Sequence, residues 1–386
     1  MIPRFRQPLA IFLGCLVSLM GADRLVAQTP PTPTPPDVRQ LLQRLAGYSS
    51  DPCGGAPAKK EGDWRVADDL AHRLFSRAAD SVAEALNANP ADSALPRERA
   101  TAALQQVEQM SAEINAEWPQ DSRFHFQVLD LSPMLVVKLS IRFQEDFFAF
   151  GVPKEISRNP NSSWRILGSN PGATEFTGPP SEIDLYPIHR GPSGDPRFLV
   201  KAIYSGCAGS IGVVYSAYKW NPRDIDLLDG IISQEGAFGL DDNVEGFPQI
   251  GKLKTDGPLI TLPYCQFSPI DTWDNPSLCA VDTYDLSGDE VKFSSRTYNR
   301  PDLVPVAKAI EFAEKRDYHA VLGYCASPEI ARRMVRVLPS DVFAGELQVS
   351  KHGDGRERVV LGDSPKYRFD VEKRGDRWIV VGFATE

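Results

Sequence analysis

The chain has 386 residues, of which 42% are hydrophobic, 24% charged and 9% aromatic. This composition supports buried cores and excludes a disordered, collagen-like or coiled-coil chain. Acidic residues outnumber basic ones by 51 to 42, which gives a formal net charge of −9. No long basic run opposes that balance, so nucleic acid is not an expected partner. The length allows two or three domains of about 150 residues each.

Residues 1–27 have the layout of a secretory signal peptide. Arg4 and Arg6 precede an apolar run that is shorter than the roughly 20 residues needed to span a membrane, and Ala27 offers a small residue for cleavage. We therefore expect an exported, periplasmic or secreted protein, cleaved after Ala27, with no transmembrane span in the mature chain. Cys15 follows a lipoprotein-like sequence but lies inside the apolar run, so lipid attachment there is the less favoured alternative.

Five cysteines remain after that cleavage, and an oxidising compartment favours pairing some of them. Cys265 and Cys279 enclose a short loop between two strand-like runs, so we expect them to form a disulfide. The odd count leaves at least one thiol free or bonded to another molecule, and buried unpaired cysteines are the alternative. The cysteines form no C-x-x-C pair and the histidines are far apart, so neither a metal nor a cofactor is predicted.

The N-terminal part of the mature chain divides into a spacer and a helical region. Residues 28–37 are rich in proline, which predicts a stiff, extended spacer. Residues 38–119 carry two apolar stripes at helical spacing, separated by a cluster of helix-breaking residues, and so predict a helical hairpin. The first stripe comprises Val66, Leu70, Leu74, Ala78, Val82 and Leu86, and the second comprises Leu104, Val107, Met110, Ile114 and Trp118.

Residues 123–300 change to strand chemistry, with alternating or apolar runs between turns rich in Gly, Pro, Asn and Asp. Three leading runs begin near Asp146, Arg197 and Leu259, separated by about 50 and 60 residues, close to the size of a propeller blade. Three units are too few to close a propeller. We therefore predict a β-rich, antiparallel, sandwich-like domain, with a partial propeller as the alternative.

Residues 301–386 predict helices followed by an antiparallel sheet. Ser327, Pro328 and Glu329 have the pattern of a helix N-terminus, and a closing hairpin runs through residues 367–383. This order of elements resembles the NTF2-like (SnoaL-like) superfamily, and the resemblance implies an α+β cone. That superfamily includes enzymes, ligand-binding domains and structural dimer modules, and no catalytic position can be matched here, so the resemblance assigns no site. The whole chain is thus predicted to be an α+β multidomain protein.

Motifs for nucleotide binding, metalloprotease or serine hydrolase chemistry are missing from the sequence. His319, beside Asp317 and Tyr318, forms the densest polar group of the C-terminal region. It has two interpretations, a residue that lines a pocket in the cone or, as we favour, an ordinary junction between a loop and a helix.

Three further groups have both a functional and an ordinary interpretation. Residues 241–246 imitate the first half of an EF-hand, but Lys252 occupies the position that needs a bidentate Glu. An acidic cluster could bind calcium, although solvated turns are the commoner cause, and it comprises Asp282, Asp285, Asp289 and Glu290. Aromatic residues placed on one strand face could stack on a sugar or peptide, although a half-buried sheet face is the commoner cause, and they are Tyr215, Tyr218 and Trp220.

The export signal, the spacer and the lack of catalytic motifs favour a non-enzymatic binding or assembly module of the cell envelope. Its partner would be a protein or a small molecule. The alternative is an extracytoplasmic hydrolase or isomerase with a pocket in or beside the C-terminal domain. That alternative predicts at least two buried ionisable side chains around one apolar cavity.

Overall fold

The computed structural model describes a large part of the chain: residues 36–48, 63–88, 95–142, 144–152, 163–169, 180, 182–205, 211–221, 224–228, 237–238, 253–255, 257–266, 268–271, 277–339, 347–353, 355–362 and 365–385. The expected signal peptide, almost the whole proline-rich spacer and the EF-hand-like segment 241–252 lie outside these residues.

The N-terminal region contains three helices rather than the two of a hairpin. They are α1 (Pro36–Leu45), α2 (Asp63–Asn87) and α3 (Pro96–Ile114). The hairpin prediction missed α1, although the helix buries an apolar stripe at helical spacing, made of Val38, Leu41, Leu42 and Leu45. Val66 also differs from the prediction, because it is 42% exposed while the rest of the first stripe is buried.

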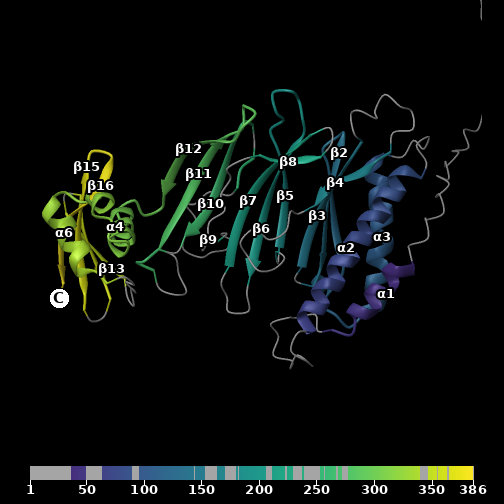
Figure 1. Ribbon diagram of the computed structural model, residues 1–386, viewed down its shortest axis with the longest axis horizontal. Coiled ribbons are helices and arrows are strands. Elements are labelled where there is room, and N and C mark those ends of the chain that lie inside the picture. Colours follow the sequence, from purple (N-terminus) through teal and green to yellow (C-terminus); the bar gives the residue numbers. More distant parts are fainter. Residues whose placement is uncertain are drawn as a thin grey trace, which may run out of the picture. The chain divides into compact units, whose positions relative to one another are not determined.

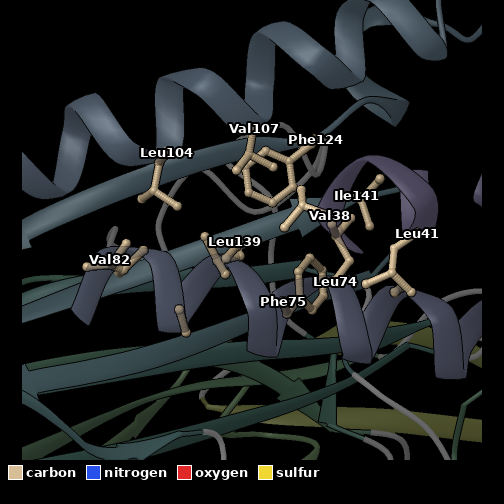
Figure 2. Packing of buried hydrophobic residues seen from close by; sticks show 14 of the residues in the cluster. Val38, Leu41, Leu74, Phe75, Val82, Leu104, Val107, Phe124, Leu139 and Ile141 are labelled. Atoms are coloured by element: carbon tan, nitrogen blue, oxygen red, sulfur yellow. The ribbon is translucent and has the colours of Figure 1, made fainter. Parts of the chain in front are cut away.

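The three helices pack on the first antiparallel sheet, whose strands follow one another in space as in sequence. This sheet comprises β1 (His125–Asp130), β2 (Met134–Ile141), β3 (Gln144–Gly151) and β4 (Arg165–Ser169). Leu139 and Ile141 of β2 point toward the helices, where they join a core that includes Phe75 and Val107 (Figure 2). Alternate residues of β2, Met134 and Val136, lie in a different core on the opposite face.

Two more four-stranded sheets follow, each again with its strands in sequence order (Figure 1). The second sheet comprises β5 (Glu182–Ile188), β6 (Arg197–Ser205), β7 (Ile211–Trp220) and β8 (Ile225–Leu228). The third comprises β9 (Ala237–Phe238), β10 (Leu259–Gln266), β11 (Leu278–Asp285) and β12 (Lys292–Tyr298).

Neighbouring sheets share buried cores, so the second sheet is buried on both faces. Phe198 and Tyr218 pack with the first sheet, whereas Leu199 and Tyr215 pack with the third. This face-to-face arrangement is common to the sandwich-like interpretation and to the partial propeller.

The aromatic residues of β7 do not form a binding face. Tyr218 and Trp220 share one face, but Tyr215 lies on the other, because an odd separation reverses the side of a strand. All three are buried. The prediction of a shared aromatic face was therefore wrong, and these side chains form the cores between sheets.

Two polar clusters, one partly and one fully buried, also join the sheets. Lys138 Nζ lies 2.8 Å from Glu145 Oε2 in the first sheet, and both side chains hydrogen-bond the backbone of Ile183 in the second. Between the second and third sheets, the guanidinium of Arg197 donates to the carbonyl oxygens of Leu286 at 3.0 Å and Gly288 at 2.8 Å.

The third sheet contains a disulfide between Cys265 and Cys279, which lie opposite each other on β10 and β11. Cys325 is free, and burial raises the pKa of its thiol to about 12. This thiol therefore stays protonated and has little nucleophilic character at neutral pH.

The C-terminal region is three helices followed by a four-stranded antiparallel sheet. Its elements are α4 (Val304–Glu314), α5 (Tyr318–Leu322), α6 (Pro328–Val337), β13 (Leu347–His352), β14 (Arg356–Leu361), β15 (Tyr367–Arg374) and β16 (Arg377–Thr385). Ser327 caps α6 by accepting the Ile330 backbone N–H at 3.4 Å. Helices and sheet enclose one apolar core.

Taken together, the six helices and four antiparallel sheets of the described residues confirm a β-rich α+β protein. Within the same residues, no helix combines the length and the apolar character that crossing a membrane requires.

Candidate functional site

The outer face of the sheet β13–β16 carries a dense set of arginines. Side chains alternate between two faces along each strand, and the inner face supplies the apolar core through residues such as Val359 and Phe369. The register places Arg356 opposite Glu372 and Arg358 opposite Asp370 on the outer face. We call this outer surface the basic face, and its arginines are Arg356, Arg358, Arg368, Arg374 and Arg377.

Two carboxylates organise four of these arginines. Glu372 lies 2.8 Å from Arg356 Nη2 and 2.8 Å from Arg374 Nε. These hydrogen bonds, first that from Arg374 and then that from Arg356, lower the pKa of Glu372. The carboxylate therefore stays ionised over the physiological range and keeps both guanidinium groups in place.

Asp370 has the same role one row along the sheet. It accepts a hydrogen bond from Arg358 Nε at 2.8 Å, and Arg368 Nε lies 3.9 Å away. A β-bulge follows Asp370, and Gly382 lies opposite it on β16. A Cβ atom at position 382 would lie 2.9 Å from Asp370 Oδ2, so glycine leaves the space that this carboxylate occupies.

Positive charge exceeds negative charge on the basic face, with five arginines to two carboxylates. Each guanidinium has five N–H donors, so a carboxylate shared by two arginines cannot accept hydrogen bonds from all of them. Arg356 and Arg374 are also well exposed, at 63% and 56% of their side chains. A planar guanidinium fits carboxylate and phosphate oxygens, so the basic face can bind an anionic partner.

A second ionisable cluster lies where α4 meets the inner face of the same sheet. Arg300 donates to Asp302 through Nε at 3.1 Å and Nη2 at 2.6 Å, and its Nη2 lies 4.0 Å from Glu357 Oε2. Glu357 shares the inner face of β14 with Val359, and its side chain is 13% exposed. Asp302 and Glu357 therefore form a largely buried carboxyl pair.

The environment moves the two pKa values of this pair in opposite directions. Burial disfavours the ionised form of Asp302, but the hydrogen bonds from Arg300 and Glu357 and the charge of Arg300 outweigh it and lower the pKa. Burial, and then the hydrogen bond and charge of Asp302, raise the pKa of Glu357. The pair therefore holds one proton at a pH where a free glutamate has lost it.

Replacing Glu357 with Gln is expected to flatten the pH dependence of stability. A raised pKa means that the folded state binds the proton more tightly than the unfolded state. The contribution of Glu357 to the stability of the fold therefore decreases as pH rises from about 4 upward. The neutral amide removes that loss. We therefore expect the free energy of unfolding of Glu357→Gln to exceed that of the wild type by up to about 1 kcal/mol at pH 7 and to equal it at pH 4. Urea unfolding at both pH values measures this, and an unchanged difference at the two pH values would contradict it.

The histidine that the sequence singled out does not line a pocket. His319 is exposed, and its ring meets the edge of the Tyr318 ring at 5.4 Å. Asp317 caps α5 by accepting the Ala320 N–H at 3.0 Å. The pocket interpretation was therefore wrong, and the segment has the geometry of an ordinary junction between a loop and a helix.

The acidic residues near β11 do not converge on one point. Asp282 is fully buried and pairs with Arg296, whereas Asp285 accepts the Ser287 N–H at 2.8 Å. Asp289 lies 3.8 Å from Arg197. In the described part of the chain no three His, Cys, Asp or Glu side chains gather to hold a metal ion. The described residues therefore do not bring this cluster together as the calcium interpretation requires.

A groove of about 480 Å³ lies between α1 and α2. Three of its charged side chains are paired with one another, since Arg77 lies 2.8 Å from Asp37 and 3.2 Å from Asp80. Seven of the eight lining residues are polar or charged, whereas the enzyme hypothesis predicts an apolar cavity.

Sequence reasoning missed the basic face, although a signal was present. Arg356 and Arg358 are two residues apart on β14, and Arg368 and Arg374 fall on the polar positions of an alternating strand. The spacing identifies a common face on each strand. Only the register between strands shows that these faces coincide.

No protein-family model and no curated protein matches the chain. Among solved structures, a thermostable family-43 glycoside hydrolase is similar at 10% identity and a TM-score of 0.20, covering 66% of this chain and 70% of its own. An NTF2-like protein involved in plasmid conjugation is similar at 6% identity and a TM-score of 0.16, covering 73% of this chain and 87% of its own. At these TM-scores neither likeness carries an argument about fold or function.

Proposed function

We propose that the protein is an exported, non-enzymatic binding or assembly module of the cell envelope, and that it binds an anionic partner through the basic face. The observation that carries this proposal is the excess of arginine over carboxylate on one solvent-facing sheet surface of a chain whose net charge is −9. An acidic protein that concentrates arginines on one face presents a localised site for negative charge.

The order of elements supports an NTF2-like domain as the frame for this site. Three helices cover the inner face of β13–β16, and the basic face is the opposite surface. The charged pairs on that surface are partly exposed, so they contribute little to stability on their own. Their density is better explained by binding than by folding.

Binding of poly-L-glutamate tests the proposal directly. We expect the full chain to bind this polymer at low ionic strength, and we expect the affinity to fall steeply with added NaCl because exposed charges are screened. Replacing Arg356 and Arg358 together with Gln is expected to weaken binding about tenfold or more. Fluorescence anisotropy of labelled polymer measures both effects.

A matched control uses arginines from elsewhere on the surface. Arg97 and Arg336 are exposed on α3 and α6, so replacing both with Gln removes the same charge from outside the basic face. The control variant should bind as wild type does. Equal losses in the two double variants, or no binding at low salt, would reject the proposal.

A hydrolase or isomerase remains the second candidate because of the carboxyl pair. Asp302 and Glu357 have pKa values moved apart, as in acid–base catalysis. The same contacts also join the start of α4 to β14, which is a structural role. We therefore place the enzyme second to the binding module.

A further inference from the structure

We propose that the partner of the basic face is an extended acidic polypeptide segment that lies along β14 and presents carboxylates at every second residue. This inference rests on the proposed function, because it assumes that the basic face is the binding surface. It adds the chemical class, the conformation and the spacing of the ligand.

The spacing of arginines on β14 sets the spacing of the ligand. Arg356 and Arg358 point to the same face of the strand, so their anchoring positions are about 6.8 Å apart, twice the rise per residue. An extended peptide places the side chains of alternate residues at the same separation. Two carboxylates two residues apart can therefore meet both guanidinium groups at once.

The two strands beside β14 differ in what they present to a ligand, β13 being open to it and β15 carrying carboxylates. Toward the sheet edge, Ser350 and His352 of β13 are exposed and lie opposite Arg358 and Arg356. On the other side, Asp370 and Glu372 hold the arginines and repel a further anion. The favourable path for an acidic segment thus follows β14 itself, over the guanidinium groups of Arg356 and Arg358.

The arginines are held in position before any ligand binds. Arg356 is fixed by Glu372 at 2.8 Å and Arg358 by Asp370 at 2.8 Å. A guanidinium that is already oriented loses less conformational freedom on binding than a free one. The planar group then offers paired donors to a carboxylate, a geometry that an ammonium group does not provide.

Two peptides of identical composition test the spacing. One alternates Asp and Ser, and the other carries the same aspartates in one block followed by the serines. Only the alternating peptide presents all its carboxylates on one face when extended, so we expect the full chain to bind it at least about fivefold more tightly. Isothermal titration calorimetry at low salt measures both affinities.

Variants of the full chain separate this inference from the proposed function. Arg356→Gln with Arg358→Gln should weaken both peptides and abolish the preference, whereas the Arg97→Gln, Arg336→Gln control should keep it. If the two peptides bind the wild type equally and both lose affinity for the Arg356→Gln, Arg358→Gln variant, the spacing is rejected and the binding site is kept. Equal affinities that survive in that variant would reject both.

Two other occupants give different results. If the basic face binds a second copy of this chain, sedimentation without peptide will show a dimer that the Arg356→Gln, Arg358→Gln variant dissociates, and the inference fails. If the ligand is a phosphate polymer, inorganic polyphosphate will compete more strongly than the alternating peptide at equal charge, and the inference also fails.

Discussion

Replacing Arg197 with Met is expected to lower the free energy of unfolding by about 2–4 kcal/mol. The Arg197 side chain is fully buried between the second and third sheets, where it donates to the carbonyl oxygens of Leu286 and Gly288. Methionine fills a similar volume but donates no hydrogen bond, so both carbonyl groups lose their partner. Urea unfolding followed by tryptophan fluorescence measures the loss.

A control substitution separates this effect from the loss of a positive charge. Arg97 is exposed on α3, and Arg97→Met should change the stability by less than about 0.5 kcal/mol. Arg197→Lys keeps the charge but not the planar group, so it should fall between the two. If Arg197→Met matched the control, the guanidinium would not be a link between the sheets.

Replacing Arg296 with Met is expected to cost about 3 kcal/mol, at the lower end of values for breaking a buried ion pair. Asp282 has no solvent exposure, and both its oxygens accept hydrogen bonds from Arg296 at 2.7 Å. Without the guanidinium the carboxylate loses both of these charge-assisted hydrogen bonds while it stays buried. Thermal and urea unfolding both measure the loss.

The two partners of this pair differ in exposure, which predicts an asymmetric mutant cycle. Arg296 is 31% exposed and lies beside the Phe293 and Tyr298 rings, so water can hydrate it when Asp282 becomes Asn. Asp282→Asn should therefore cost less than Arg296→Met, and the double variant less than the sum, by about 1–3 kcal/mol. Lys292→Met, on the same strand, is the control for an exposed charge. Additive losses would show that the pair is not coupled.

Periodicity in the sequence predicted the helices and strands well where one face is buried. The stripe through Leu70 and Leu74 and the N-terminal pattern at Ser327 correspond to α2 and α6. Helix α1 lies almost wholly within the predicted helical region 38–119, but its short apolar stripe was not recognised as a third helix. The long apolar stripe of α2 and the N-terminal pattern of α6 were thus recognised, and the short stripe of α1 was missed.

The repeat in the β-rich region was detected, but the strand chosen to lead its first unit was not equivalent to those chosen in the other two. The run at Asp146 lies in β3, the third strand of its sheet, whereas those at Arg197 and Leu259 lie in β6 and β10, the second strands of theirs. The strand equivalent to β6 and β10 is β2, which is buried on both faces. A strand without alternation gives no sign of its place in a sheet.

Candidate site residues were harder to predict than the fold, because sites depend on pairing between strands. Sequence proximity selected His319 and the acidic residues near β11, but the structure leaves His319 exposed and gives the acidic residues separate partners. The contacts that matter join residues such as Arg358 and Asp370, which are twelve positions apart. Register across a sheet decides these contacts, and the spacing of residues along one strand does not reveal it.

The double-sided burial of the second sheet also constrains the order in which the chain can fold during its synthesis. Once β8 has emerged, the face that carries Leu199 and Tyr215 is still open to solvent, because the strands that cover it begin after residue 236. A chain halted at that point has an exposed apolar surface that promotes aggregation. The second sheet is therefore fully covered only after the third sheet has been made, and until then this face is a surface that a chaperone can bind.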